Sequence, residues 1–479
     1  MNASWNLETS YKQLPPVFYT EMSPNHVENP KLIIWNEELA KELGISFDEK
    51  FIPFLAGNEW PEGTEPIAQA YAGHQFGHFT MLGDGRAILL GEQFTSKGKK
   101  VDIQLKGAGR TPYSRGGDGR AAVGPMLREY LISEAMHALG ISTTRSLAVV
   151  ATGEKVIREE DLDGAILTRI ASSHIRVGTF QFAAKYVGVE GVRELADYTI
   201  ERHFPEISHT ENRYIQLVER MMVNQASLIA KWMEVGFIHG VMNTDNMTLS
   251  GETIDYGPCA FMDRYHPETV FSSIDRNGRY AYGNQPPIGA WNIARLAETL
   301  LPLIHEDTEE AIRIAEETVD KYPRIYHSYW LDGMRLKLGL STNEKEDVDL
   351  VQQLLILMGK YDADYTNTFR ALTLNEYDDE DLFVTVEFSD WKQQWQERLS
   401  RENQTISEAG KRMKAYNPAI IPRNYWVEEV LQEAVEHQNY TPFRTFLDAL
   451  KQPYAYHSSQ EKYSRIPKDD GPYQTYCGT

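Results

Sequence analysis

Three polar residues in the middle of the chain have the types and spacing of a site for a metal and a phosphate. His239 begins the run HGVMNTDN, Asn246 ends it, and Asp255 follows nine residues later in the run DYG. An amide and a carboxylate offer oxygen atoms that Mg²⁺ or Mn²⁺ accepts, with phosphate oxygens completing the shell. We expect Asn246 and Asp255 to bind such a cation, brought together by a hairpin over residues 247–254.

The same run is similar to the catalytic loop of protein kinases, where an aspartate two residues after the histidine accepts the proton of the substrate hydroxyl. In this chain that position is Val241, which cannot accept a proton. Asp245 is the only carboxylate of the loop that could replace the missing base, although a capping hydrogen bond is its alternative role. The chain therefore either does not catalyse or does different chemistry on a nucleotide.

A lysine and a glutamate precede this loop in the order that kinases use. Lys106 ends a predicted strand over residues 101–106, and Glu129 lies in a predicted helix over residues 127–139. In kinases such a pair fixes the lysine against the nucleotide phosphates. The alternative is a solvated lysine and a glutamate paired with Arg128, but the order of the motifs favours the functional interpretation.

Glycines and arginines gather in two further runs. Gly83, Gly85 and Arg86 form a GDGR turn, in which backbone amides and an arginine can bind an anion, although a plain hairpin turn has the same sequence. Arginines among glycines also suit the bidentate binding of phosphate oxygens, while surface loops carry arginine too. The run GAGRTPYSRGGDGR and the residues after it supply Arg110, Arg115, Arg120, Arg169 and Arg176.

The elements that would position these residues divide into a strand-rich front and a helical back. Predicted strands cover residues 87–92, 101–106, 146–150 and 164–170, with the helix 127–139 between them. Predicted helices cover residues 214–236, 291–304, 308–321, 347–359 and 426–437. We therefore expect an α+β fold of two lobes that form one unit, a β-rich N-lobe with one key helix and a mainly helical C-lobe.

Composition excludes several function classes. The chain of 479 residues has 48 basic and 69 acidic residues, and its net charge of −21 argues against nucleic acid or an anionic membrane as the main partner. A run of eighteen apolar residues and a secretory signal are both absent, so we expect a cytoplasmic protein. His74 and His78, four residues apart, could be helical metal ligands, but the neighbouring glycines favour a structural role.

Together these motifs resemble the family of selenoprotein O and its bacterial relatives, the SelO/YdiU protein adenylyltransferases. The similarity covers nearly the whole chain and rests on YAGHQFGHF, LGDGRAILLGE, DIQLKGAGRTPYSRGGDGRAAVGPMLREYLISEAMHALGI, HGVMNTDNM, IDYGP and NPAIIPRNYWVEEVL. The resemblance implies a protein-kinase-like fold that binds ATP in a flipped orientation together with Mg²⁺ or Mn²⁺. It implies transfer of AMP to Ser, Thr or Tyr hydroxyls of protein substrates, with release of pyrophosphate.

Motif by motif, the resemblance also implies roles for single residues. Asp245 would accept the proton, Lys106 would bind phosphate and be oriented by Glu129, and Asn246 and Asp255 would bind the metal. The implied nucleotide contacts are Gly83, Gly85, Arg86, Lys106, Asp118, Gly119, Arg169, Arg176 and Asp255. The implied domains are an N-terminal extension packing on the core (1–65), an N-lobe (66–170), a C-lobe (171–400) and a C-terminal helical extension (401–479).

Three other functions stay open at this point. The chain could be a non-catalytic, ATP-binding pseudokinase or redox adaptor, a protein UMPylase that uses UTP, or a protein kinase with Asp245 as a displaced base. Some family members carry selenocysteine near the C-terminus, where this chain has Cys477. A disulfide between Cys477 and Cys259, the other cysteine, would lock the tail over the site and let a redox partner control it. Two inert thiols are the alternative.

Overall fold

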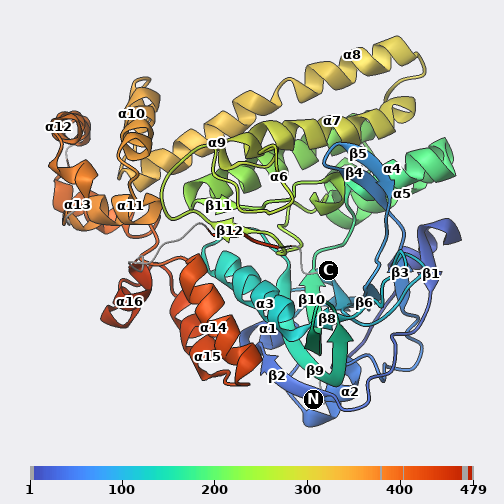
Figure 1. Ribbon diagram of the computed structural model, residues 1–479. Helices are drawn as coiled ribbons and strands as arrows, with labels where there is room; N and C mark the ends of the chain where they lie inside the picture. The colour runs from blue at the N-terminus through green and yellow to red at the C-terminus, as the bar shows by residue number, and fades with distance from the viewer. Residues whose placement is uncertain (1–4, 378–379, 403, 466–472, 477–479) are drawn as a thin grey trace.

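The computed structural model describes residues 5–377, 380–402, 404–465 and 473–476. Strands gather in the first 171 residues and helices dominate the rest, and the main sheet lies apart from most of the helices (Figure 1). The predicted α+β fold with a strand-rich front and a helical back is confirmed at this level.

An eight-stranded antiparallel sheet carries Lys106 and Arg169 on adjacent strands. Its order is β1-β3-β6-β7-β10-β9-β2, with β8 paired to β10. In the register of β7 and β10, Lys106 faces Leu167 and Arg169 faces Gln104, so both cations lie on the same face of the sheet. The strands are β1 (Tyr19–Glu21), β2 (Lys31–Trp35), β3 (Ile67–Gln69), β6 (Ala87–Phe94), β7 (Lys100–Lys106), β8 (Ala121–Ala122), β9 (Arg145–Ile157) and β10 (Asp161–Ala171).

The N-terminal residues supply both outer strands of this sheet. β1 pairs with β3 at one end, and β2 pairs with β9 at the other. Neither of these two strands was predicted from the sequence, because three to five residues are too few for an alternating pattern to stand out. β9 and β10 are also longer than predicted.

Helix α3 (Val123–Ala138) packs on β9 and β10 and presents Glu129 to the sheet. Leu127, Leu131 and Ala135 are buried on one side of it, as its periodicity predicts. The helix begins four residues before the predicted start, because Pro125 lies in its first turn, where the missing N–H is tolerated.

The helical part is built around α6 (Arg213–Glu234), which contacts α7 and α9. Helices α14 and α15 return to pack against α3, so the end of the chain covers the sheet-rich part (Figure 1). The other helices are α1 (Glu37–Glu42), α2 (Ile52–Leu55), α4 (Val177–Phe182), α5 (Val189–His203), α7 (Gln285–Ile304), α8 (Thr308–Val319), α9 (Tyr322–Lys337), α10 (Asp347–Lys360), α11 (Tyr365–Leu374), α12 (Val386–Ser400), α13 (Ile406–Met413), α14 (Asn424–Glu436), α15 (Thr441–Leu450) and α16 (Glu461–Ser464). Two hairpin strands, β4 (Ala72–Gln75) and β5 (His78–Met81), form their own sheet, as do β11 (Phe237–Ile238) and β12 (Ala260–Phe261).

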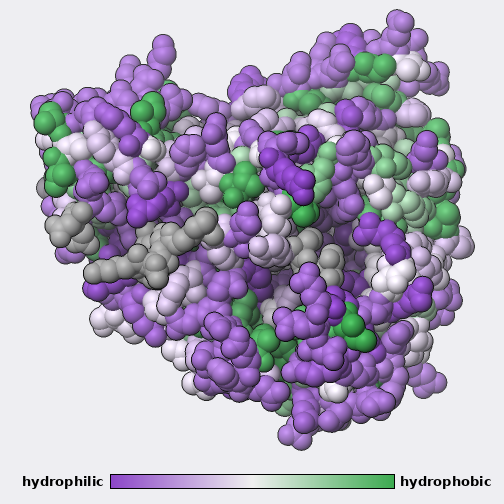
Figure 2. Space-filling view, in the orientation of Figure 1, coloured by the Kyte–Doolittle hydropathy of each residue, from purple (hydrophilic) through white to green (hydrophobic). Residues whose placement is uncertain are grey.

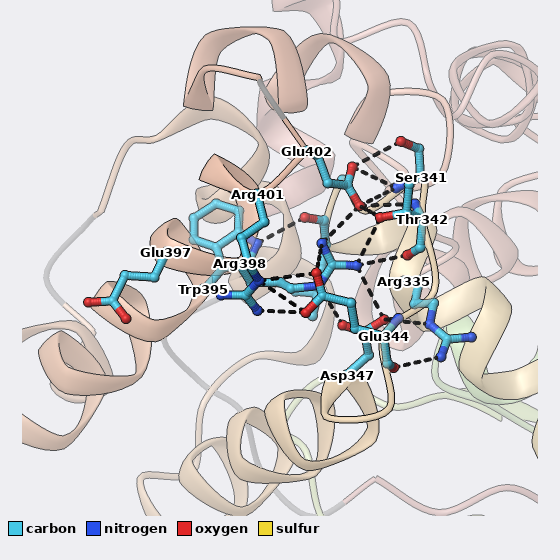
Figure 3. A network of polar contacts seen from close by, with 12 residues as sticks. Arg335, Ser341, Thr342, Glu344, Asp347, Trp395, Glu397, Arg398, Arg401 and Glu402 are labelled. Carbon is cyan, nitrogen blue, oxygen red and sulfur yellow. Dashed lines mark hydrogen bonds and ion pairs between the residues drawn. The ribbon is translucent and has the colours of Figure 1, made fainter.

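A buried network of charges fixes the outer helices to one another (Figure 3). Arg398 of α12 donates from Nε to Asp347 Oδ1 at 2.7 Å, and Arg335 of α9 donates to the other oxygen of Asp347 at 2.8 Å. Glu402 accepts hydrogen bonds from the backbone of Ser341 and Thr342 in the loop after α9. These contacts hold α9, α10 and α12 in one unit.

The face of the molecule shown in Figure 2 is predominantly hydrophilic. On the face that Figure 2 shows, hydrophobic residues form small separate patches among polar ones. None of the helices in the described part of the chain combines the length and apolar character that a membrane span requires.

Candidate nucleotide site

A cavity of about 330 Å³ lies between the sheet-rich part and the helical part, lined by residues of both. The structure brings nearly all of the predicted site residues together here, although they come from segments up to 172 positions apart. Those that line the cavity are Gly83, Gly85, Arg86, Lys106, Asp118, Gly119, Arg169, Arg176, Asp245, Asn246 and Asp255. Glu129 lies behind Lys106 and lines an adjoining cavity.

Lys106 and Arg169 are the cations of a four-residue charge cluster at the base of the cavity. Lys106 Nζ lies 2.6 Å from Glu129 Oε2 and 2.7 Å from Asp255 Oδ1. Arg169 Nη2 lies 2.6 Å from Glu129 Oε1 and 2.6 Å from Asp255 Oδ1. The predicted contact between Lys106 and Glu129 is therefore present, and Arg169 joins it.

The two carboxylates of the cluster stay ionised because of these cations. Burial by itself raises the pKa of Glu129, but Arg169 and Lys106 outweigh it and hold the pKa below its ordinary value. Burial of Asp255 is likewise outweighed by Lys106 and Arg169, so the pKa of Asp255 lies well below its ordinary value. With two cations and two anions the cluster is electrically balanced by itself.

Asp255 has an unusual backbone conformation. Its φ of 62° lies in the left-handed region, which residues with a side chain adopt at a cost. His239, the first residue of the motif, is buried and its Nε2 donates to the carbonyl of the preceding Ile254 at 2.9 Å. His239 therefore links the loop 239–246 to Asp255.

The hairpin predicted between Asn246 and Asp255 is wrong in its pairing. A turn forms, because the hydroxyl of Thr248 donates to the carbonyl of Glu252 at 2.7 Å. The two arms, however, bridge to other segments: Thr248 to Arg176 and Thr253 to Thr143. The arms are at most three residues long, so contacts with the rest of the fold decide their partners.

Asp245 lies in a 3-10 turn over Thr244–Asn246 and is 8% exposed. Its Oδ1 atom is buried and has no hydrogen-bond partner among the described residues. Burial raises the pKa of Asp245 to about 6, against the opposing charge of Arg176. A buried carboxylate with a free oxygen and this pKa is ionised at neutral pH and can still take a proton.

The hairpin β4–β5 lies against this turn, and its role was not predicted. The backbone N–H of His74 donates to Thr244 Oγ1 at 2.7 Å, and a Cβ on Gly73 would lie 3.0 Å from Asp245 Oδ1. Gln75 lines the cavity and forms a side-chain hydrogen bond with Asp245. In the sequence, only the glycines of YAGHQFGHF pointed to this hairpin. They predicted that the segment is not a helix, but they did not predict that it contacts the loop of Asp245.

The two glycine runs lie across one another at the cavity. A Cβ on Gly83 would lie 2.4 Å from the ring of Tyr113, and one on Gly85 would lie 2.9 Å from the carbonyl oxygen of Tyr113. Gly119, with φ of 68°, would place a Cβ only 2.0 Å from the carbonyl oxygen of Gly109. These glycines are therefore required for close approach to the Tyr113 side chain at Gly83 and to the neighbouring backbone at Gly85 and Gly119, whatever ligand the cavity takes.

Arg176 and Asp118 occupy contrasting positions in the cavity. The fully buried guanidinium of Arg176 lies 4.3 Å from the ring centroid of Tyr71 and donates to the backbone carbonyl of Asp245 at 3.3 Å. The side chain of Asp118 is 44% exposed and pairs with Arg158 at 2.8 Å. Tyr71 and Arg158 line the cavity too, and the sequence motifs did not single them out.

Asn246 and Asp255 each keep an oxygen that a cation could use. The amide nitrogen of Asn246 donates to the carbonyl of Val241 at 2.9 Å, which leaves the amide oxygen. Asp255 uses Oδ1 for Lys106 and Arg169, which leaves Oδ2. In the described part of the chain, no three His, Cys, Asp or Glu side chains gather as a metal cage. These two ligands fit a hard cation that takes its remaining oxygens from phosphate and water.

A second cavity, of about 610 Å³, adjoins the first and shares Arg86, Lys106 and Gly257 with it. Helices α3 and α14 and residues 473–476 form its other walls. Arg128, the alternative partner considered for Glu129, instead pairs with Glu428 of α14 at 2.8 Å.

Cys259 lines neither of these two cavities. Cys259 is fully buried, and burial raises the pKa of its thiol to about 12. Cys477 lies outside the described residues, so the predicted disulfide and the redox partner stay predictions. The neighbouring Thr475 does contact the loop after Asp255, because its hydroxyl donates to the carbonyl of Pro258 at 2.7 Å.

Comparison with known families finds a match over residues 2–451 to the family described as "Protein adenylyltransferase SelO". The match includes every residue that lines the first cavity.

Curated relatives are similar over the full length. A "Protein nucleotidyltransferase YdiU" of Anoxybacillus flavithermus is 60% identical over 484 aligned residues, covering 100% of both chains. Proteins of the same name from Geobacillus kaustophilus and Clostridium botulinum are 59% and 58% identical, covering 100% of this chain and 100% and 99% of theirs.

Proposed function

The chain belongs to the SelO family of protein adenylyltransferases and is a nucleotidyltransferase, and we propose that it transfers AMP from ATP to Ser, Thr or Tyr hydroxyls of proteins. The observation that carries this proposal is the cavity that joins Lys106, Arg169 and Arg176 to the buried carboxylate of Asp245. Three cations suit a polyphosphate, and a carboxylate with a free oxygen suits a hydroxyl that must lose its proton.

The arrangement supports a kinase-like ancestry for the site. A strand lysine held by a helix glutamate, followed by a loop with Asn246 and then by Asp255, is the set of parts that kinases use. We propose that residues 66–170 and 171–400 form the corresponding N-lobe and C-lobe. Residues 1–65 would then pack on the first lobe, and residues 401–479 would form a C-terminal helical extension with a Cys-bearing tail.

The chain lacks the aspartate that protein kinases use as a base, and this difference bears on which phosphorus atom of ATP reacts. Because Val241 replaces that base, we propose that ATP lies flipped, with its α-phosphorus toward Asp245 and its far phosphates on Arg169 and Arg176. Glu129 positions Lys106 on the phosphates.

The other nucleotide contacts are assigned by their place in the cavity. Gly83, Gly85 and Arg86 would approach the phosphates, while Asp118 and Gly119 would line the nucleoside end.

In the proposed step, the acceptor hydroxyl gives its proton to Asp245 and its oxygen bonds to the α-phosphorus. The bond from that phosphorus to the bridging oxygen of the β-phosphate breaks, and pyrophosphate leaves. Lys106, Arg169 and Arg176 offset the negative charge on the phosphates. A Mg²⁺ or Mn²⁺ ion on Asn246 and Asp255 would supply further charge neutralisation at the phosphate oxygens.

The test uses ATP labelled at the α-phosphorus or, separately, at the γ-phosphorus. Purified protein and Mg²⁺ are incubated with each nucleotide and a protein mixture as acceptor, and label is followed on denaturing gels. Retention from the α position alone is the expected result. Retention from the γ position alone would instead identify a kinase that uses Asp245 as its base.

Two controls separate the remaining alternatives. α-Labelled UTP in place of ATP tests for transfer of UMP, and stronger labelling by UTP would replace the proposed donor. ATP binding without any labelling, in wild-type protein and in Asp255→Ala alike, would favour a non-catalytic adaptor.

A further inference from the structure

Two arginines lie against one indole ring beside the β4–β5 hairpin. The guanidinium carbon of Arg279 lies 4.8 Å from the ring centroid of Trp291, and that of Arg295 lies 5.1 Å from it. Trp291 and Arg295 are four residues apart on α7, so they share one side of that helix. His74 of the hairpin meets the indole edge-on at 5.4 Å. We call Arg279, Trp291 and Arg295 the arginine rim.

The arginine rim is joined to the loop that bears Asp245. Tyr280, next to Arg279, donates from its hydroxyl to Asn243 Oδ1 at 2.5 Å. The backbone N–H of Phe76 in the hairpin turn donates to the same oxygen at 3.0 Å. Asn243 lines the nucleotide cavity two residues before Asp245. A peptide lying on the arginine rim would therefore be close to the proposed base.

The guanidinium groups of Arg279 and Arg295 have only some of their possible hydrogen-bond and ion-pair partners within the described part of the chain. Among the described residues, Arg279 pairs with no carboxylate, and Arg295 pairs with Glu298 of its own helix. The Nε atoms of Arg279 and Arg295 are both buried and have no hydrogen-bond partner in the described part of the chain. Buried donors normally find acceptors. Because these Nε atoms are buried, a carboxylate that arrives from another molecule would bind the two guanidinium groups through their Nη atoms instead.

Charge and hydrophobicity around the rim narrow the class of partner. Arg276, three residues before Arg279, is exposed and adds a third positive charge. The chain as a whole is acidic, with a net charge of −21, so this group of arginines differs in sign from the average surface. On the hairpin, Phe79 and Met81 are 38% and 39% exposed, and Phe79 contacts His74. Arginine and aromatic side chains are the types that dominate binding at protein interfaces.

We propose that the arginine rim binds an acidic side chain of the protein acceptor, next to the hydroxyl that receives AMP. This inference rests on the proposed transferase function and adds the class of acceptor to it. A planar guanidinium forms two parallel hydrogen bonds with a carboxylate, so Arg279 and Arg295 favour acceptors with Asp or Glu near the hydroxyl. A lysine at the same place would be repelled, which gives discrimination as well as affinity.

The experiment compares three synthetic peptides that share one serine and one phenylalanine. Their other residues are rich in Asp and Glu, in Asn and Gln, or in Lys. With wild-type protein at low salt, we expect kcat/KM for AMP transfer to the acidic peptide to exceed the neutral one about tenfold, with the difference shrinking as salt is added. Arg279→Glu combined with Arg295→Glu should reverse the order, so that the lysine peptide becomes the better acceptor.

The control variant is Arg220→Glu, which changes the charge of an arginine on α6 whose side chain is 51% exposed. It should keep the wild-type order of peptides, and calorimetry should show the same affinity for ATP in all variants. A reversal of preference cannot come from a structural defect, because a defect would lower transfer to every peptide. Equal transfer to the three peptides, or an acidic preference that survives in the double variant, would overturn the rim proposal while the transferase function stands. Absence of α-label on any acceptor would overturn both.

Discussion

Arg176 donates from Nη1 to the backbone carbonyl of Asp245 at 3.3 Å, and the two residues line the same cavity. The positive charge of Arg176 also opposes the rise that burial causes in the pKa of Asp245. Arg176, which we assign to phosphate binding, therefore helps to set the position and the proton affinity of Asp245, which we assign as the base. Phosphate binding and proton transfer are linked at this contact.

The first prediction concerns the pH dependence of transfer. Asp245 accepts a proton only when it is ionised, and burial raises the pKa of Asp245 to about 6. Transfer should therefore rise with pH through about 6 and reach a plateau above it. Asp245→Asn should lower kcat by roughly 10²- to 10⁴-fold and remove this rise. Rates of α-label incorporation from pH 5 to pH 8 measure both.

Asp245→Asn also tests how the burial of this carboxylate affects the stability of the fold. A carboxyl whose pKa is raised in the folded state stabilises the fold at low pH and loses that contribution as pH rises through the folded pKa. At pH 8 the ionised, partly unsatisfied Asp245 therefore opposes folding. Asp245→Asn should not lower the Tm at pH 8. A wild-type pH profile in Asp245→Asn would exclude this residue as the base.

The second prediction concerns Asp255. Asp255→Ala and Asp255→Asn should abolish transfer, because both remove the carboxylate assigned to the cation. Either change also leaves Lys106 and Arg169 with Glu129 as their one carboxylate in the cluster. Binding of metal-free ATP, measured by calorimetry in a chelator, should therefore be kept or strengthened. Labelling at the wild-type level in Asp255→Ala would contradict the site assignment.

The third prediction uses two glycines of the same loop. Gly119 and Gly116 have φ of 68° and 87°, so alanine at either position meets the left-handed backbone cost of about 1–2 kcal/mol. A Cβ on Gly119 would also lie 2.0 Å from the carbonyl oxygen of Gly109, whereas nothing lies within 4 Å of one on Gly116. Gly119→Ala should weaken ATP binding at least tenfold more than Gly116→Ala does. Equal affinities would mean that the contact is dispensable.

The fourth prediction concerns the network of Figure 3. Burial raises the pKa of Glu402, but hydrogen bonds from Thr342 and Ser341 outweigh it and bring the pKa to about 2, from an ordinary 4.5. A lowered folded-state pKa means that the stabilisation is present above about pH 4.5 and is lost as pH falls toward 2. Glu402→Gln should lower the Tm at pH 7 and flatten its dependence between pH 5 and pH 3.

Glu397 is the matched control for this network. It lies on α12, which ends two residues before Glu402, and its side chain points away from the other labelled residues in Figure 3. Glu397→Gln should leave the Tm and its pH dependence unchanged. A similar loss in both variants would attribute the effect to the charge of α12 rather than to the contacts of Glu402.

Local sequence patterns predicted the elements that carry most of the charge cluster. The alternation of β7, the helical period of α3 and the long stripe of α6 are each set by residues close in sequence. The contact between Lys106 and Glu129 followed from the order of those elements. The cluster that Lys106 and Glu129 form with Arg169 and Asp255 did not follow from that order. It depends on the register of β7 on β10, which places Arg169 beside Lys106.

Contacts between distant segments were beyond such patterns. His74 and Thr244 are 170 positions apart, and neither residue type predicts that the β4–β5 hairpin will contact the loop of Asp245. The arms around residues 247–254 looked like partners because a turn joins them. They bridge instead to Arg176 and Thr143, since short strands take the partners that the surrounding fold provides.

The two outer strands of the main sheet have a consequence for how the chain folds during its synthesis. β2 emerges from the ribosome early, but its partner β9 follows roughly a hundred residues later. Until then β2 has no strand to pair with, and its run KLIIW is a site for premature association. Slower translation of the segment between them would lengthen this exposure, and chaperones that cover hydrophobic nascent segments would matter most within it.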